Sequence, residues 1–378
     1  KKRLEFLNSH DQFALMEHTN IKSVNFDAGV KNYFDAHNLS EIQKYAKDSK
    51  IMSVIKSNGY GHGILEVASA LKKSDAFAVA TINEAIYLRN NNIEKQIVCL
   101  QGFSNTEECI YCSQNNIRPV VHNHEQINIL KNTNLQKPIS IWIKFDTGMN
   151  RLGFKETDLA TLINEVKEKT QYPIGIMTHL ACADDGHDNF SQKQIERFHD
   201  IVKNTKSEFS VFNSAGIIKY SKKYQNFSEW IRPGIMLYGV SPLSNCGNDI
   251  NIKPAMTLVA PAISIKKCKQ GEKIGYGHTY EFKKDTMVAS LGIGYGDGVS
   301  RNLTNTGKVF FENNYFNIVG RISMDIITID IGDKKIDIGS NFELWGDNIN
   351  IKEVSDSINT IPYELMCGLG DRLQRKYI

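Results

Sequence analysis

The chain has 378 residues, of which 41% are hydrophobic and 23% charged, and a formal net charge of +3. This balance is typical of a globular protein with enough apolar material for a core, and at about 100–200 residues per domain the length predicts two or three domains. Basic runs such as Lys222-Lys223 are too short for a nucleic-acid footprint, and no apolar run has the length of a membrane span. We therefore expect neither nucleic acid nor a membrane as a partner.

The seven cysteines follow no disulfide framework. Cys109-Ile-Tyr-Cys112 lacks the second ligand pair that a structural zinc site needs, so no metal is expected. Free thiols in a reducing cytoplasm are the favoured interpretation. The sequence shows no signal peptide, although a start at Lys1 rather than Met is compatible with a leader that has been removed.

Eight short apolar runs alternate with amphipathic segments in the first part of the chain. They are predicted strands at Ile51–Ile55, Ala76–Ala80, Gln96–Leu100, Arg118–His122, Ile139–Phe145, Ile174–Thr178, Phe209–Phe212 and Glu229–Arg232. Predicted helices between them include Leu65–Lys73, Glu84–Asn90, Leu159–Lys169 and Gln192–Lys203, the last with Ser191 as its N-cap. This alternation predicts a (β/α)8 TIM-like barrel over residues 26–243, with a doubly wound sheet as the structural alternative. In a barrel, the chemistry lies at the C-terminal ends of the strands.

The pattern changes after about Pro242. Strand-like runs at Met256–Ile265, Met287–Leu291 and Ile326–Ile331 are separated by Gly, Asn and Asp turns, with little helical periodicity. We therefore expect a separate, mostly β domain over residues 244–378. Residues 1–25 have no clear place in the barrel, and either a leading strand of the β domain or an ordered tail is compatible with them.

A lysine ends the first predicted strand. Lys56 is followed by Ser57-Asn58-Gly59-Tyr60-Gly61-His62-Gly63, where glycines allow the backbone to approach a ligand closely. Burial and neighbouring cations would free the lysine amine as a nucleophile or base, although on spacing alone a surface lysine is the more frequent explanation. The segment resembles the pyridoxal-phosphate (PLP) lysine motif of alanine racemases, which usually has alanine in place of Gly59. The resemblance implies that Lys56 binds PLP covalently and removes the α-proton on the D-alanine face, and that Tyr60 contacts the phosphate.

The resemblance extends from about Val24 onward. The segment 144–153, KFDTGMNRLG, is similar to the fifth-strand motif of the family. By this similarity Arg151 meets the substrate carboxylate and the phenolic oxygen of the cofactor, where a planar cationic fork is suited to the task. Lys144 stands where many members carry a carbamylated lysine that orients that arginine.

Three later strand ends match the family's cofactor contacts. His179 corresponds to a histidine beside the pyridine ring, and Asn213, Ser214, Gly234 and Ile235 to phosphate and ring contacts. Barrels often bind phosphate in the loops after strands seven and eight, and this rule independently supports Ser214, Gly234 and Ile235 as phosphate contacts.

The resemblance also implies that Arg232 is the partner of the pyridine nitrogen. A guanidinium stays protonated and does not readily give up a proton, so the ring would remain a weaker electron sink than in the many PLP enzymes that place an acid there. Reprotonation at Cα is thereby favoured over transamination.

Racemisation needs a base on each face of a planar intermediate. The segment 274–280 resembles the family's catalytic tyrosine segment, which implies that Tyr276 takes the α-proton of L-alanine, with Tyr280 as the rival within the segment. Tyr295 corresponds to a residue that narrows the substrate entrance, and the Met324 backbone to a substrate-carboxylate contact. In this family the residues matching Tyr276 and Met324 reach the active site of the partner subunit, so a head-to-tail homodimer is implied.

One position departs from the family pattern: Asp371 stands where some members have a phosphate-binding tyrosine that also forms a gate. The function implied is interconversion of L- and D-alanine, which supplies D-alanine for bacterial peptidoglycan. A racemase of broader specificity for lysine, arginine or serine is the first alternative. A decarboxylase on the same architecture would need a cysteine and an acid from the β domain, and a non-catalytic PLP-binding homeostasis protein would resemble the barrel alone.

Overall fold

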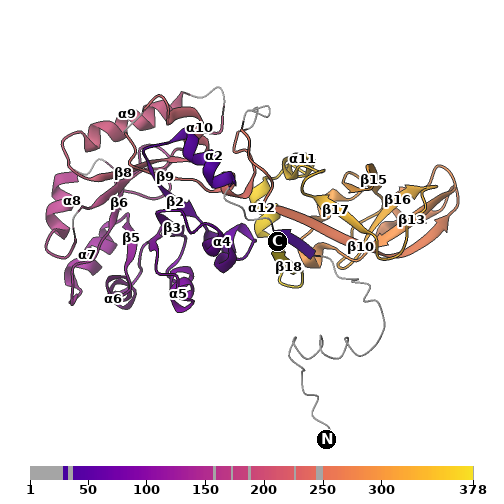
Figure 1. Cartoon of the computed structure of the whole chain (residues 1–378), viewed down its shortest axis with the longest axis horizontal. Coiled ribbons are helices and arrows are strands. Elements are labelled where there is room, and N and C mark those ends of the chain that lie inside the picture. The colour runs from indigo at the N-terminus through magenta and orange to yellow at the C-terminus, as the bar shows by residue number, and fades with distance from the viewer. Residues whose placement is uncertain are drawn as a thin grey trace, which may run out of the picture. The chain divides into compact units, whose positions relative to one another are not determined.

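The computed structural model describes residues 29–32, 37–155, 159–171, 173–185, 189–224, 227–243 and 250–377. These residues form two compact units (Figure 1). The barrel unit comprises the described residues of Val30–Thr257 and Trp345–Leu369 together with residues 375–377, and the β unit comprises Leu258–Leu344 and Gly370–Gln374. Among the described residues, no helix combines the length and the apolar character needed to cross a membrane.

Eight parallel strands close the barrel. In order around it they are β2 (Lys50–Val54), β3 (Ala76–Val79), β4 (Gln96–Cys99), β5 (Ile117–Val121), β6 (Trp142–Lys144), β7 (Gly175–Met177), β8 (Glu208–Asn213) and β9 (Trp230–Arg232). Pairing of β2 with β9 completes the ring. Each strand coincides with one of the eight predicted runs, so the predicted barrel is confirmed and the doubly wound alternative is excluded.

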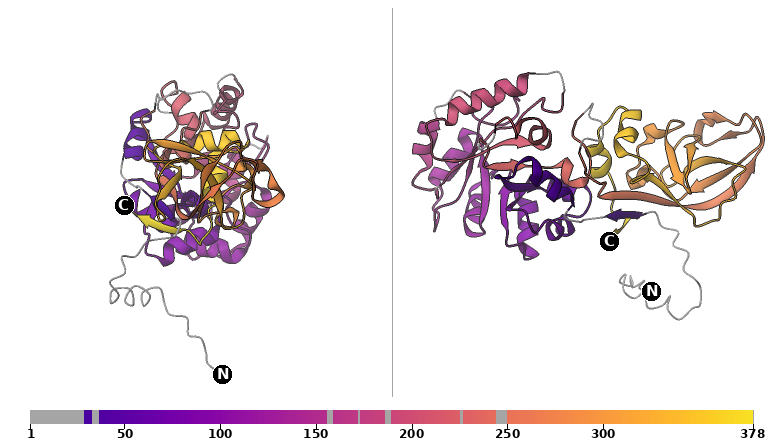
Figure 2. Two further views of the ribbon diagram at one scale, coloured as in Figure 1. Left: turned by 90° about the vertical axis from the view of Figure 1, so that its right-hand side faces the viewer. Right: turned by 45° about the horizontal axis from the view of Figure 1, so that its top comes forward.

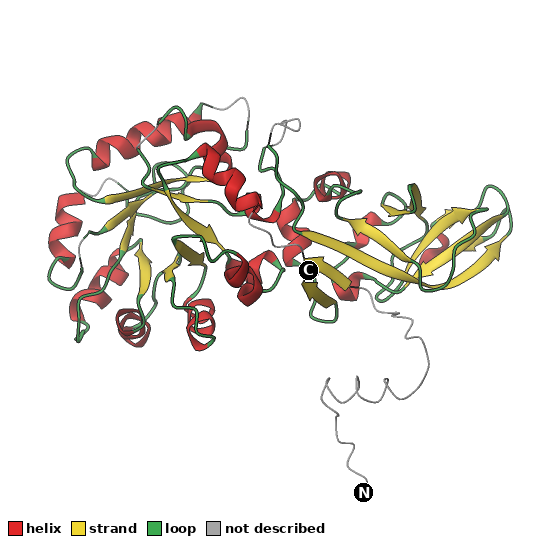
Figure 3. Ribbon diagram, in the orientation of Figure 1, coloured by secondary structure: helices red, strands yellow, loops and turns green. Residues whose placement is uncertain are grey.

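Helices cover the outside of the barrel (Figures 2 and 3). They are α2 (His37–Tyr45), α4 (Ile64–Ala70), α5 (Ile82–Asn90), α6 (Thr106–Gln114), α7 (His124–Asn132), α8 (Leu159–Val166), α9 (Phe190–Val202) and α10 (Ser214–Tyr220). The short segments α3 (Lys56–Tyr60) and η1 (Ile235–Tyr238) follow β2 and β9 at the C-terminal ends of the strands. Thr81, Asn105, Asn123 and Asn213 cap four of these helices through side-chain oxygens that accept backbone N–H bonds. Because such caps fix where a helix begins, they hold the loops at the C-terminal ends of the strands.

The prediction of Ser191 as an N-cap is wrong. Helix α9 begins at Phe190 after Asn189, and Ser191 is a buried residue inside its first turn, where its hydroxyl has no hydrogen-bond partner among the described residues. A Cβ placed on Gly148 would lie 2.6 Å from Phe190 Cζ. This packing of Phe190 against the loop after β6 accounts for the earlier helix start, and it is a tertiary contact that a local capping pattern does not contain.

The β unit is built on an antiparallel sheet. Its strands are β10 (Met256–Cys268), β13 (Thr286–Leu291), β14 (Lys308–Phe311), β15 (Asn314–Ile318), β16 (Ile327–Gly332) and β17 (Asn341–Trp345), with a small hairpin of β11 (Lys273–Ile274) and β12 (Tyr280–Glu281) and three 3-10 turns, η2 (Tyr276–His278), η3 (Tyr295–Asp297) and η4 (Arg301–Leu303). The order is β13-β16-β15-β14-β17-β10, and β13 also pairs with β10, which closes the ring. The three predicted runs coincide with β10, β13 and β16.

Three elements depart from the expected division of the chain. Strand β1 (Gly29–Asn32), from the range expected for the barrel, follows β10 in the antiparallel sheet and pairs in turn with β18 (Gln374–Tyr377). Two short helices, α11 (Ile351–Ser357) and α12 (Pro362–Cys367), belong to the barrel unit although they come from the range expected to be mostly β. Elements of four to seven residues contain too few periods for a hydrophobic pattern to identify them. The limits 26–243 and 244–378 stay predictions, and a leading strand within residues 1–25 falls outside the described residues.

A buried ion pair lies near the N-terminal ends of the barrel strands. Arg118 Nη1, near the start of β5, lies 2.8 Å from Glu208 Oε2, at the start of β8. The guanidinium also lies over the ring of Trp142, 4.8 Å from its centroid, and its side chain is only 5% exposed. This pair joins two strands at the end of the barrel opposite the strand C-termini.

Replacing Arg118 with alanine should lower the free energy of unfolding by about 3 kcal/mol, because it leaves the largely buried Glu208 carboxylate with only the more distant Lys50 ammonium, at 3.8 Å, as a partner. The control is Lys203→Ala, which removes an exposed pair with Asp200 and should cost at most about 1 kcal/mol. Urea denaturation of both variants checks the difference, and similar losses in the two would contradict the assignment.

Candidate active site

A cavity of about 660 Å³ opens where the barrel strands end. All ten barrel residues selected from the sequence line it: Lys56, Tyr60, Lys144, Arg151, His179, Asn213, Ser214, Arg232, Gly234 and Ile235. They come from the ends of β2, β6, β7, β8 and β9 and from the segments that follow. The structure therefore brings together residues that are up to 179 positions apart in the sequence, the separation between Lys56 and Ile235.

Lys56 stands at the beginning of an unusual turn. The next four residues, Ser57, Asn58, Gly59 and Tyr60, have φ values of 53°, 52°, 61° and 52°, so they form a left-handed turn. Burial and then the Arg151 guanidinium lower the pKa of Lys56. Both effects raise the fraction of neutral amine, the form that acts as a nucleophile or base.

Lys144 and Arg151 place two further cations in the cavity. Burial, followed by Arg232 and Arg151, lowers the pKa of Lys144 to about 8. The acid nearest in sequence, Asp146, is engaged by the backbone N–H groups of Gly148 and Asn150 at 2.9 and 3.0 Å. Arg151 has no hydrogen bond or ion pair within the described part of the chain, so its guanidinium is available to an anionic ligand.

Arg232 is a buried guanidinium, 4% exposed. It donates to Ser210 Oγ and to the Thr178 carbonyl oxygen, both at 2.5 Å, and burial lowers its pKa to about 10. Its Nη2 lies 3.4 Å from Nδ1 of His179. Burial and then Arg232 hold the pKa of His179 well below its usual range, so the imidazole is neutral and the Arg232 charge is not paired with an acid among the described residues.

The other end of the cavity is rich in neutral hydrogen-bond donors. The N–H of Gly234 donates to Ser214 Oγ at 2.9 Å, and a Cβ on Gly234 would lie 2.6 Å from the hydroxyl oxygen of Tyr60. The Tyr60 ring stacks on Tyr238 with centroids 4.6 Å apart, and burial raises the pKa of Tyr60. Tyr60 is therefore a fixed, protonated donor beside the backbone N–H groups that begin α10 and η1, an arrangement that suits a phosphate.

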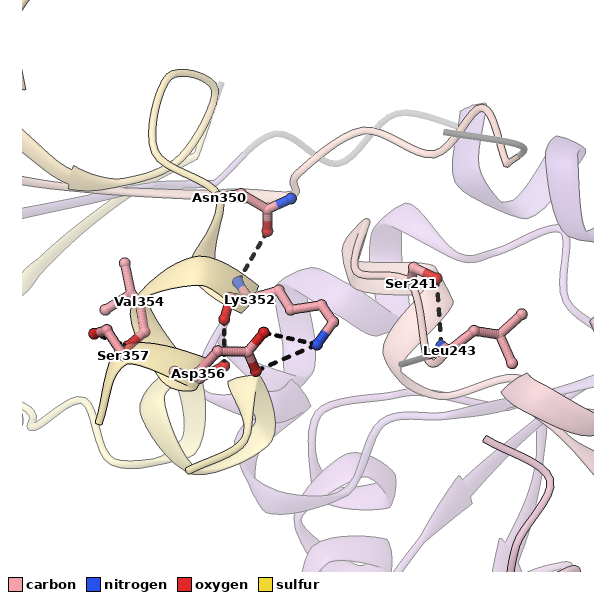
Figure 4. A network of polar contacts seen from close by, with 8 residues as sticks. Ser241, Leu243, Asn350, Lys352, Val354, Asp356 and Ser357 are labelled. Carbon is pink, nitrogen blue, oxygen red and sulfur yellow. Dashed lines mark hydrogen bonds and ion pairs between the residues drawn. The ribbon is translucent and has the colours of Figure 1, made fainter. Parts of the chain in front are cut away.

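The outer wall of the cavity contains residues that the sequence did not single out as site residues. On α11, Lys352 and Asp356 form an ion pair at 3.0 Å (Figure 4), and on α12 the Tyr363 ring lies 5.8 Å from that of Tyr60. Asp184 also lines the cavity. Its place in the segment after β7, five residues beyond His179, was a usable signal, since such segments form barrel sites. The residues of the short helices α11 and α12 gave no comparable signal.

Three predicted site residues lie together in the β unit, whereas all the cavity residues lie in the barrel unit. Tyr276, Tyr295 and Met324 are 72%, 44% and 53% exposed. Backbone hydrogen bonds join the turn that contains Tyr295 to the turn that contains Met324, with the Gly296 N–H donating to the Met324 carbonyl oxygen at 2.8 Å. Their exposure leaves an apolar and aromatic surface open, the kind of patch that marks a contact site.

The rival Tyr280 has a packing role. It packs against a core cluster that includes Phe282, with the two rings edge to face and 5.3 Å between centroids. Asp371, the departure from the family pattern, is exposed, while the neighbouring Arg372 binds Asp297 and Asp325 at 2.9 Å each. Of the two tyrosines, only Tyr276 presents its side chain outward.

The chain matches two family models over most of its length. The model described as alanine racemase, N-terminal domain, covers residues 36–242, and the model described as alanine racemase, C-terminal domain, covers residues 255–377. The chain is 39% identical over 341 residues to an alanine racemase of Shewanella woodyi, spanning 89% of this chain and 94% of the relative. It is 37% identical over 355 residues to that of Haemophilus influenzae, spanning 93% and 98%.

Solved structures agree with these matches. A biosynthetic alanine racemase from Pseudomonas aeruginosa superposes with a TM-score of 0.88 at 30% identity, covering 93% of this chain and 99% of that one. An alanine racemase from Bartonella henselae with covalently bound pyridoxal phosphate gives a TM-score of 0.83 at 30% identity, covering 93% and 100%.

Replacing Gly59 with alanine should destabilise the left-handed turn, because φ is +61° and the new Cβ would lie 2.7 Å from Val67 Cγ2. The loss in unfolding free energy from the backbone conformation alone should be about 1–2 kcal/mol. Gly271→Ala is the matched control, since Gly271 has φ of +82° with nothing within 4 Å. Denaturation should show a larger loss for Gly59→Ala, and Val67→Ala should reduce that excess; equal losses at the two glycines would contradict the predicted clash.

Proposed function

The chain belongs to the alanine racemase family, a family of PLP-dependent isomerases, and we propose that it interconverts L- and D-alanine with Lys56 and Tyr276 as its two bases. The observation that carries this assignment is the convergence of Lys56, Lys144, Arg151, His179 and Arg232 on one cavity. Both the N-terminal and the C-terminal domain models match this chain. This argues against the non-catalytic PLP-binding protein, because such a protein would resemble the barrel alone. A decarboxylase is disfavoured, since the exposed candidate in the β unit is a tyrosine.

The cavity fits PLP in charge and in chemistry. Lys56 offers an amine of lowered pKa for covalent attachment, and Tyr60, Ser214, Gly234 and Ile235 would hold the phosphate. Arg232 would face the pyridine nitrogen, with His179 beside the ring and Asn213 steadying the start of α10 through its bond from the Gly216 N–H at 2.9 Å. When bound, PLP supplies the electron sink that stabilises negative charge at Cα.

Two groups of the protein would move the α-proton. A base on each side of Cα is needed to invert the centre, and each base returns its proton on the reverse reaction. Lys56 would serve the D-alanine face and Tyr276 the L-alanine face. Arg232 is fixed by Ser210 and the Thr178 carbonyl group. It would donate a hydrogen bond to the pyridine nitrogen and retain its own proton, which would limit electron withdrawal and favour return of the proton to Cα.

Arg151 would bind the substrate carboxylate, and Lys144 would orient it as a carbamate. Carbamylation needs a neutral amine, which a pKa of about 8 supplies in part at neutral pH. The product is an anion close to Arg151, whose charge is otherwise uncompensated within the described residues. The Met324 backbone would complete the carboxylate site.

A second copy of the chain would supply Tyr276 and Met324. Both belong to the exposed patch of the β unit, so a head-to-tail homodimer would give each copy's cavity the partner's phenol, with Tyr295 narrowing the entrance. A cytoplasmic location stays a prediction, as does the supply of D-alanine for peptidoglycan.

Chiral analysis of product formed from L-alanine and PLP tests the activity, and we expect D-alanine. Lys56→Ala should abolish both the reaction and the absorbance of the PLP–lysine adduct, whereas Tyr276→Phe should abolish the reaction and keep the absorbance. Release of CO2, or an adduct retained in Lys56→Ala, would contradict the assignment.

Mixing the two inactive variants tests whether sites are shared. After random exchange of subunits about half of the dimers are mixed, and one of the two sites in each has both Lys56 and Tyr276, so activity should return to about a quarter of the wild-type value. Recovery near zero would place both bases in one chain and reject the shared site.

The Lys144 assignment predicts a pH dependence. Because its pKa is lowered to about 8, the neutral amine predominates above that pH and is lost as the pH falls below it. At a fixed concentration of dissolved ¹³C-labelled CO2, the molecule that the neutral amine attacks, carbamylation followed by NMR should therefore be faster at pH 9 than at pH 6. Lys144→Ala should remove the signal and Lys131→Ala, at an exposed lysine, should not; a signal that survives Lys144→Ala would overturn the assignment.

A further inference from the structure

The left-handed turn after Lys56 needs external support. Three of its four residues, Ser57, Asn58 and Tyr60, carry side chains at positive φ, a conformation that is unfavourable for residues with a Cβ. Strained backbone of this kind persists only where the surrounding structure holds it in place. Groups outside the turn must therefore hold it in this conformation.

Two side chains of β18 bind the carbonyl groups of the two residues that directly follow the turn, Gly61 and His62. Arg375 Nε donates to the Gly61 carbonyl oxygen at 3.0 Å, and the Tyr377 hydroxyl donates to the His62 carbonyl oxygen at 3.0 Å. Arg375 also donates through Nη2 to the Leu369 carbonyl oxygen at 3.3 Å, which ties it to the chain just beyond α12. The contact of Arg375 with Gly61 spans 314 positions of the sequence, and that of Tyr377 with His62 spans 315.

His62 completes the support from inside the turn. Its Nδ1 lies 3.0 Å from the Gly59 carbonyl oxygen and 2.9 Å from that of Tyr60. The ring is fully buried and packs on Tyr238 with centroids 4.6 Å apart. The carbonyl groups of four successive residues, 59 to 62, are thus bound by side chains.

Close packing leaves the turn little room to shift. A Cβ on Gly61 would lie 2.0 Å from the Met366 carbonyl oxygen, and one on Gly63 would lie 2.4 Å from the Tyr377 hydroxyl oxygen. Both glycines have positive φ, +79° and +100°. All of these residues belong to the barrel unit, so the contacts lie within one compact body.

We propose that Arg375 and Tyr377 are positioning residues that hold the left-handed turn and thereby aim the Lys56 amine and the Tyr60 hydroxyl into the cavity. Lys56 begins the turn and Tyr60 is its fourth left-handed residue, so movement of the Gly61 and His62 carbonyl groups displaces both. The inference rests on the proposed function in one respect, namely that Lys56 is the lysine that binds PLP.

The test uses the full chain with Arg375→Ala, Arg375→Lys, Tyr377→Phe and the double variant Arg375→Ala/Tyr377→Phe. Tyr87→Phe and Arg301→Ala are matched controls at exposed positions. The first measurement is hydrogen exchange of the Gly59, Gly61 and Gly63 amides, which donate to carbonyl groups of residues 55, 57 and 58 at 2.9, 3.0 and 2.9 Å. The second is the dissociation constant of PLP, and the third is the pH dependence of the adduct absorbance.

In the double variant, exchange at these three amides should rise about tenfold or more, the change expected from loss of a hydrogen bond with a charged donor. Amides in α5 should keep their rates. Binding of PLP should weaken by a similar factor and the titration of the adduct absorbance should shift, while Arg375→Lys should recover part of the loss because lysine retains a cationic donor. The controls should match the wild type.

Unchanged exchange at the three amides would overturn the proposal, as would an equal rise throughout the barrel, which indicates general destabilisation. Faster exchange with unaltered PLP binding and titration would also overturn it, because the turn would then not control the lysine. Failure of the proposed function is recognised separately: an adduct that persists in Lys56→Ala shows that another lysine binds PLP, whatever the exchange rates of the turn.

Discussion

The structure of the site depends on an excess of positive charge at the carboxyl end of the barrel. Lys56, Lys144, Arg151 and Arg232 converge there, and no described carboxylate forms an ion pair with any of them. Bringing cations together out of water is costly, and this cost lowers the pKa of both lysines and keeps His179 neutral. Anions that enter the cavity would reduce this repulsion, and the cofactor phosphate, the substrate carboxylate and the proposed carbamate of Lys144 would all act in this way. Binding of such ligands to the folded chain alone also stabilises the fold.

Much of the barrel could be predicted because parallel strands buried on both faces appear in the sequence as continuous apolar runs. The ends of the eight predicted runs lie within about three residues of the ends of β2 to β9. Because active sites of (β/α)8 barrels lie at the C-terminal ends of the strands, the predicted barrel also placed the chemistry there. Residue types alone did not assign roles to His179 or Arg232. Those came from the family resemblance, and the structure adds the physical link between them, the 3.4 Å approach of Arg232 Nη2 to His179 Nδ1.

The features that could not be predicted depend on contacts between distant segments. Ser191 has the side chain of an N-cap, yet the packing of Phe190 moves the helix start. Asn58 and Gly59 are residue types that readily adopt positive φ, but Ser57 and Tyr60 are not, so the sequence does not indicate that the left-handed turn extends over all four residues. Its supports, Arg375 and Tyr377, are more than 300 positions away, and pattern analysis within a short window does not connect them to Lys56.

The proposed exchange of Tyr276 between subunits follows from the same charge excess. A phenol that gives up its proton acquires a negative charge, and nearby cations stabilise that charge. Within one chain Tyr276 is 72% exposed, where solvent screens such an interaction. Insertion into the cation-rich cavity of a second copy would remove that screening and would bring the phenol to the side of Cα opposite Lys56. One electrostatic feature would therefore attract the cofactor phosphate, bind the substrate carboxylate and activate the second base, and assembly of the proposed dimer would then be a condition of the chemistry.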